Sequence, residues 1–254
     1  MRWWNREPTE ERPSASVGAA TDVGRVRTEN EDAYGHRSVD GGRLFVVADG
    51  MGGHTRGQEA STTAVEVVQN AYASGGDAPV MDRLREAFHR ANRRVYALAQ
   101  EGEGPGSMGT TVTALLLARG RSYLAHVGDS RAYRLTANAC QQLTEDHTMA
   151  ASMHREGLIT EEEVHTHPRR GTLTRAIGTE PTVQVDVTDL GPITAGDRFL
   201  LCTDGLADLP PSVLTDLVRG HPPQDACEQL VQQANDRGGF DNATALVVHV
   251  PNVT

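Results

Sequence analysis

Hydrophobic and polar positions repeat with two different periods along the chain, and the two periods predict different kinds of element. Apolar residues recur every three or four positions in 57–73 and 80–100, which predicts two amphipathic helices. The same spacing predicts a helix and two shorter helical segments over 223–235, 149–156 and 212–219. Runs of apolar, β-branched and aromatic residues predict strands over 16–21, 43–47, 109–117, 123–127, 132–135, 182–188, 198–203 and 243–250.

Four of the predicted strands are bordered by an aspartate. Three strands lead into the acid and the last one follows it; the residues are Asp49, Asp129, Asp204 and Asp241. If these strand ends meet at one edge of a sheet, the carboxylates repel one another unless cations lie among them. A cluster of oxygen ligands suits hard divalent ions such as Mg²⁺ or Mn²⁺. One Asp-Gly pair is usually an ordinary turn, but the repetition predicts a metal site.

A polar cluster at residues 27–32 lies between two strand-like segments. Arg27 is suited to hold an anion, because its planar guanidinium can donate two parallel hydrogen bonds. Glu31 and Asp32 are candidates for the shells around a metal ion. Taken alone, a stretch this polar is more often a solvated turn.

Residues 145–175 differ from the rest of the chain, because they are polar and lack long apolar runs. An insertion of this kind beside a site is where we expect a mobile flap. His165 and His167 are expected on a loop within it. Two alternate histidines on a loop can bind a metal ion, but they are usually bystanders.

Composition and charge narrow the classes of protein. Of the 254 residues, 38% are hydrophobic and 23% charged, which indicates one globular domain after a disordered polar tail over residues 1–14. The net charge of −10 argues against nucleic acid as a partner. The longest apolar run, 114–118, is too short for a membrane span. Because the N-terminus also lacks a secretory signal, we expect a cytoplasmic protein.

A set of short motifs follows in order along the chain. The motifs are Arg27-x-x-Asn30-Glu31-Asp32, Asp49-Gly50-Met51-Gly52-Gly53-His54, Gly109-Thr110-Thr111, Val127-Gly128-Asp129-Ser130-Arg131, Leu173-Thr174-Arg175-Ala176-Ile177-Gly178, Thr203-Asp204-Gly205-Leu206 and Asp241-Asn242-Ala243-Thr244. Each motif is weak singly, but the ordered set spans roughly residues 15–251 and is highly specific. The set resembles the bacterial form of protein phosphatase 2C, the family of metal-dependent Ser/Thr phosphatases.

The resemblance implies an α/β (α+β) fold. The expected architecture is a four-layer αββα sandwich, two stacked antiparallel sheets flanked by helices, with the flap inserted over about 145–175. The catalytic domain would cover 15–251. It would hold two, or with a further site three, Mn²⁺ or Mg²⁺ ions at one end of the sandwich.

The resemblance also assigns roles to single residues. Asp49 would bridge two ions with the Gly50 carbonyl on one of them, and Asp204 and Asp241 would hold the other. Asp129 would be a ligand of the third ion, Glu31 would reach an ion through water, and Asp32 and Asn242 would orient the ligands. Arg27 would grip the substrate phosphate. The flap would contribute four residues, His165, His167, Arg169 and Arg170.

The implied activity is hydrolysis of phosphoserine and phosphothreonine by direct attack of a hydroxide that bridges the two ions. The enzyme would be a monomer that opposes a bacterial Ser/Thr kinase and acts on its phosphoprotein substrates. One alternative is a phosphatase dedicated to a single regulatory phosphoprotein of the anti-anti-sigma type. Another is a non-catalytic pseudophosphatase, which the presence of Asp49, Asp204 and Asp241 disfavours.

The sequence departs from the family pattern at a few positions. Met51 stands where some relatives have a histidine proposed as proton donor, and His54 is nearby but shifted, so the general acid is not assigned. His126 replaces a common asparagine, and Gly171 replaces a frequent larger residue. These last two positions belong to the third-ion site and the flap, so they affect substrate selection more than basic activity.

Overall fold

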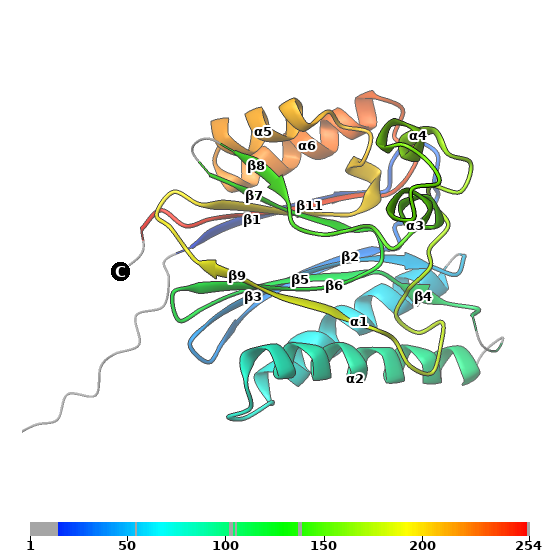
Figure 1. Cartoon of the computed structure of the whole chain (residues 1–254), viewed down its shortest axis with the longest axis horizontal. Helices are drawn as coiled ribbons and strands as arrows, with labels where there is room; N and C mark the ends of the chain where they lie inside the picture. The colour runs from blue at the N-terminus through cyan, green and yellow to red at the C-terminus, as the bar shows by residue number, and fades with distance from the viewer. Residues whose placement is uncertain (1–14, 54, 102–103, 105, 137–138, 253–254) are drawn as a thin grey trace, which may run out of the picture.

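Within the residues that the structure describes, two antiparallel β-sheets stack face to face, and helices cover the outer face of each (Figure 1). This computed structural model describes residues 15–252 apart from 54, 102–103, 105 and 137–138. The predicted tail over 1–14 and His54 therefore lie outside the described residues. The predicted four-layer αββα sandwich is confirmed.

All neighbouring strands in both sheets are antiparallel. The first sheet contains β1 (Ser16–Asp22), β11 (Ala243–His249), β10 (Arg198–Cys202), β7 (Arg131–Leu135) and β8 (Cys140–Gln142), in that spatial order. The second contains β2 (Asp32–Val39), β3 (Gly42–Met51), β5 (Val112–Ala118), β6 (Arg121–Val127) and β9 (Asp186–Pro192), with β4 (Gly109–Thr110) paired to β3.

Strand β3 shows how one continuous apolar run serves two packing layers. Side chains of a strand alternate between its faces. Phe45 and Val47 pack into the core between the sheets, whereas Leu44 and Val46 pack against the helices outside. All four side chains are fully buried. Because both faces of the strand are covered, its sequence is hydrophobic at nearly every position. The packing on both faces also fixes the position of Asp49 near the end of the strand.

The covering helices form where the apolar period of three to four residues was found. The second sheet is covered by α1 (Thr55–Ala73) and α2 (Val80–Glu101), and the first by α5 (Pro211–Gly220) and α6 (Pro223–Asp236). The predicted boundaries are confirmed to within two residues. These four helices lie above and below the two sheets, and the acidic strand ends lie at one end of the sandwich (Figure 1).

The inserted segment lies at that same end (Figure 1). It contains α3 (Met149–Arg155) and α4 (Glu161–Thr166). Its two ends are joined by backbone hydrogen bonds, from Met149 N to Thr172 O and from Thr174 N to His147 O. We call these paired ends, residues 147–149 and 172–174, the flap neck.

Some predicted elements are corrected by the structure. The expected strand 109–117 is interrupted at Thr111, whose N–H bonds Asp49 O outside the regular ladder, and becomes β4 and β5. The strand expected over 182–188 begins only at Asp186, where pairing with β6 starts. His165 lies in helix α4 rather than on a loop. The overlooked signal was the capping box, in which Thr160 and Glu163 bond each other's backbone.

Candidate metal centre

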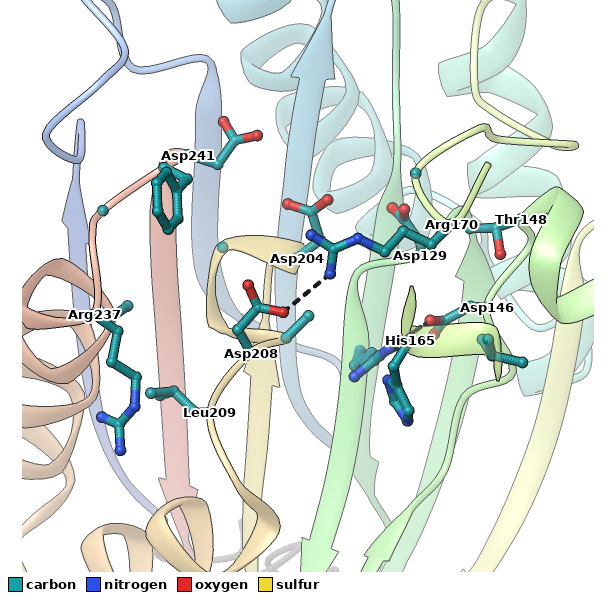
Figure 2. A pocket seen from close by; sticks show the side chains of 18 residues that line it. Asp129, Asp146, Thr148, His165, Arg170, Asp204, Asp208, Leu209, Arg237 and Asp241 are labelled. Carbon is teal, nitrogen blue, oxygen red and sulfur yellow. Dashed lines mark hydrogen bonds and ion pairs between the residues drawn. The ribbon is translucent and has the colours of Figure 1, made fainter. Parts of the chain in front are cut away.

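The acidic residues predicted at strand ends come from both sheets rather than from one. Asp49 lies in β3 and Asp129 follows β6 in the second sheet, whereas Asp204 follows β10 and Asp241 precedes β11 in the first. The expectation of a single sheet edge was therefore wrong. The carboxylates instead meet at one end of the sandwich, where Figure 2 shows Asp129, Asp204 and Asp241 around one pocket of about 230 Å³.

Because three of these acids, Asp49, Asp129 and Asp204, are buried close together, their pKa values are raised. Burial, followed by repulsion from Asp32 and Asp204, raises the pKa of Asp49 well above its usual range. Burial and the charge of Asp204 raise the pKa of Asp129 to about 8. The pKa of Asp204 is also raised, by burial and then by Asp241. Such a cluster is electrostatically unfavourable when empty, and divalent cations would relieve it.

The carboxylates fit a metal centre by their chemistry, although they do not form a complete cage. Among the described residues, no group of three or more His, Cys, Asp or Glu side chains is already arranged as the ligands of an ion. The site is thus an open array of oxygen donors, of the type that Mg²⁺ and Mn²⁺ bind with additional water. Asp49, Asp204 and Asp241 also line a larger cavity of about 560 Å³, which leaves room for a ligand.

Asp32 lies directly opposite Asp49 in the β2–β3 pair. One of its carboxylate oxygens, Oδ2, accepts hydrogen bonds from Thr203 Oγ1 at 2.8 Å and Thr244 Oγ1 at 2.6 Å. Among the described residues the other oxygen, Oδ1, has no hydrogen-bond partner although it is buried. A buried carboxylate held in this way by hydroxyl groups of the opposite sheet fits the expected orienting role, and its free oxygen suits contact with a hydrated ion.

Asn242 fixes the loop that carries Arg27 and Glu31. Its Nδ2 donates to Val23 O and Glu29 O, both at 2.9 Å, while its Oδ1 accepts from Glu31 N at 2.8 Å. All three hydrogen-bonding groups of the amide are therefore used. This side chain supports the site through the loop backbone.

Gly50, near the end of β3, stands at a position where only a glycine fits. Its N–H donates to Glu31 O at 3.1 Å, and a Cβ at this position would lie 2.1 Å from Gly57 O. A Cβ at Gly57 would lie 2.6 Å from the Glu31 carboxyl carbon, so a larger residue there would displace the Glu31 side chain. The absence of both side chains lets β3, α1 and the loop at Glu31 approach closely beside the acids.

Arg27 lies at the rim of the larger cavity. Its Nη2 donates to Asp241 Oδ2 at 2.8 Å, and its side chain remains 52% exposed. A guanidinium has five N–H donors in a planar fork. One ion pair therefore leaves donors for an incoming anion, as the sequence predicts.

The four flap residues do not behave alike. His165 and Arg170 line the pocket with Asp204, and Arg170 donates to Asp208 at 3.1 Å (Figure 2). His167 and Arg169 instead interact with each other, since His167 Nδ1 accepts from Arg169 N at 3.1 Å. The structure thus brings His165 and Arg170 to the site and does not bring the two histidines together as a metal-binding pair.

Sequence reasoning overlooked the residues that fix the Asp129 turn. Arg131 donates to both carboxylate oxygens of Asp146, with distances from 2.7 to 3.2 Å. Gly128 N donates to His147 Nδ1 at 3.0 Å. The adjacent Asp146-His147 pair, at the start of a polar segment, was the signal that could have indicated them.

Comparisons with known proteins show the family of the chain. Residues 24–247 match the family described as protein phosphatase 2C. The serine/threonine phosphatase Stp of Listeria welshimeri is 36% identical over 235 residues, covering 90% of this chain and 93% of that protein. The crystal structure of the PPM Ser-Thr phosphatase MsPP from Mycobacterium smegmatis, in complex with cacodylate, has a TM-score of 0.81 at 38% identity and covers 92% of this chain and 98% of its own.

A second solved structure bears on the cofactor. The catalytic domain of the serine/threonine protein phosphatase PstP, in complex with two manganese ions, has a TM-score of 0.81 at 30% identity and covers 94% of this chain and 99% of its own. The chain belongs to the protein phosphatase 2C family, whose members are metal-dependent phosphatases. In the described part of the chain, no helix combines the length and apolarity needed to cross a bilayer.

Proposed function

We propose that this chain hydrolyses phosphoserine and phosphothreonine in proteins, with Asp49, Asp204 and Asp241 as the main ligands of two Mn²⁺ or Mg²⁺ ions. The observation that supports this most directly is the burial of mutually repelling carboxylates beside a half-exposed arginine. Without counter-ions such a cluster opposes folding. When bound, the ions acidify water for attack on phosphorus and neutralise charge on the phosphoryl oxygens.

The chain's own cation in this reaction is Arg27. Its ion pair with Asp241 fixes the direction of the guanidinium. The donors that remain would hold two oxygens of the phosphoryl group and offset the charge that develops there during displacement. Arg27 thus binds and orients the substrate, and it needs no proton transfer to do so.

The other assignments belong to the same proposal. Asp129 would take a third, weaker ion beside Asp204. The Gly50 carbonyl and Glu31 would complete the shells. Asn242 holds the Glu31 backbone in place, and Asp32, held by Thr203 and Thr244, would orient the hydrated ion. Manganese is our preferred ion in an assay, because an oxygen array of this openness accepts it readily.

The substrates would be proteins phosphorylated by a bacterial Ser/Thr kinase. No feature of the site favours a single dedicated phosphoprotein over a range of them, so the general activity is the proposal. A monomeric state and a cytoplasmic location stay predictions. The catalytic domain over 15–251, with a flap over about 145–175, is likewise part of the proposal.

The test is phosphate release from a phosphothreonine peptide, measured with manganese and with a chelator. We expect manganese-dependent turnover by the wild type and a loss of about a thousandfold in Asp241→Ala, because a ligand and the partner of Arg27 disappear together. Asp189→Ala is the matched control, since that aspartate lies in β9 and pairs on the surface with Arg121. Absence of turnover by the folded wild type with manganese would overturn the proposal.

A further inference from the structure

The turn that carries Asp129 is attached to the flap neck by an unusual pair of hydrogen bonds. Gly128 N donates to the side chain of His147, at Nδ1, over 3.0 Å. In return, His147 N donates to Gly128 O over 2.8 Å. Gly128 has φ of +113°, and a Cβ there would lie 2.5 Å from Thr111 Cβ. The position of the Asp129 backbone is therefore set by residue 147.

The second ring nitrogen of His147 points to another partner. Because Nδ1 accepts from Gly128 N, the ring proton of neutral His147 is on Nε2, which donates to Asp186 Oδ2 over 2.9 Å. Asp186 also accepts from Arg175, at 2.8 and 3.3 Å. Arg175 directly follows the C-terminal side of the flap neck. One side chain thus joins the Asp129 turn to both ends of the flap.

The surroundings of His147 keep its ring in this orientation. The residue is 2% exposed, and its ring centroid lies 4.7 Å from that of His126. His126 is itself fully enclosed, with Nδ1 hydrogen-bonded to Thr113 Oγ1 at 2.8 Å. A ring rotation of His147 would break its bonds to Gly128 and Asp186 together. Nothing in the proposed chemistry uses this histidine, so the arrangement requires another explanation.

We propose that His147 is a positioning residue that couples the flap to Asp129. Through Nδ1 it fixes the Gly128–Asp129 turn, and through Nε2 it fixes Asp186, which holds Arg175 beside the flap neck. Displacement of the flap by a protein substrate is then transmitted to the carboxylate of Asp129, and ion binding at Asp129 restrains the flap. The inference rests on the proposed function for its substrate, but the coupling itself is a property of the fold.

Two substitutions of His147 each keep one of its two side-chain hydrogen bonds, to Gly128 or to Asp186, and remove the other. In His147→Asn, the amide oxygen occupies the place of Nδ1 and can accept from Gly128 N, but the side chain is too short for Asp186. In His147→Gln, the amide nitrogen reaches the place of Nε2 and can donate to Asp186, while the acceptor for Gly128 is lost. Asp189→Asn, on the exposed part of the same strand as Asp186, is the control.

The readouts are calorimetric titration with Mn²⁺, hydrogen exchange of residues 145–175 in metal-free protein, and kcat and KM for a phosphothreonine peptide and for p-nitrophenyl phosphate. For His147→Gln we expect the weakest Mn²⁺ site to lose about tenfold in affinity, as supporting residues of metal ligands do. Its flap exchange should stay as in wild type. For His147→Asn we expect faster flap exchange and a several-fold higher KM for the peptide alone.

The measurements on the two His147 variants either support or overturn the coupling between the flap and Asp129. If both folded variants keep wild-type manganese affinity, flap exchange and kinetics, or if both change all readouts alike, the coupling role is overturned. If either substitution prevents folding, Asp186→Ala carries the test, because it removes the acceptor of the Nε2 bond at a side chain that is 42% exposed, and it should speed flap exchange as His147→Asn does. A wild type that binds manganese but releases no phosphate refutes the proposed function, while exchange and titration still decide on His147.

Discussion

Asp32→Asn is the substitution for which the structure gives the clearest thermodynamic expectation. Burial raises the pKa of Asp32 to about 7, although the bonds from Thr244 and Thr203 oppose the shift and the charge of Asp204 adds to it. The pKa in the folded protein is thus above the unfolded value. For an acid, this means that the unfolded chain releases the proton first. In metal-free protein the carboxylate therefore opposes folding, increasingly as the pH rises from about 4 to about 7.

The size of the effect follows from linkage. With a pKa of 3.8 unfolded and about 7 folded, Asp32 costs about 1 kcal/mol of folding free energy at pH 4.5 and about 4 kcal/mol at pH 8. Asparagine removes this cost and keeps an acceptor for both threonine hydroxyls. Its amide nitrogen would replace the partnerless Oδ1, which costs about 1–2 kcal/mol at every pH. The variant should be more stable than wild type by about 2–3 kcal/mol at pH 8 and nearly equal at pH 4.5.

Urea unfolding in the presence of a chelator at the two pH values measures this difference. Asp197→Asn is the control, because Asp197 pairs with Arg134 in a buried ion pair, and its loss should destabilise the protein at pH 8. Saturating manganese should raise the free energy of unfolding of Asp32→Asn by less than it raises that of the wild type. A stability difference between Asp32→Asn and wild type that does not grow with pH would refute the reasoning.

Two further substitutions test other parts of the site. Arg27→Ala should lower kcat/KM for a phosphothreonine peptide about a hundredfold while leaving manganese affinity within a few-fold, since the role proposed for the arginine is to bind phosphate rather than ions; equal losses in both quantities contradict that role. Gly50→Ala should lower the free energy of unfolding by about 2–3 kcal/mol, because its Cβ would lie 2.1 Å from Gly57 O. Chemical denaturation checks this, and an unchanged midpoint contradicts the predicted clash.

Residues whose surroundings are local could be predicted from the sequence. The run leading to Asp49 has the pattern of a strand buried on both faces, and the helix over 80–101 has the apolar spacing of one covered face. The strand over 182–188 was misplaced because Val183 and Val185 do pack against the core, yet β6 offers them no ladder partner before Asp186. Burial gave the correct pattern, and pairing with a distant strand decided the boundary.

The arrangement of the site depends on contacts that no local pattern contains. Asp32 belongs to the second sheet, but Thr203 directly follows β10 of the first sheet and Thr244 lies in its strand β11, and they lie 171 and 212 residues further along the chain. These two bonds join the sheets at the level of the acids. The packing of Phe45 against the inter-sheet core then fixes the spacing between them. The proposed metal centre, with ligands from both sheets, is therefore held in register by the core of the sandwich, so that loosening this core should weaken ion binding before it unfolds the chain.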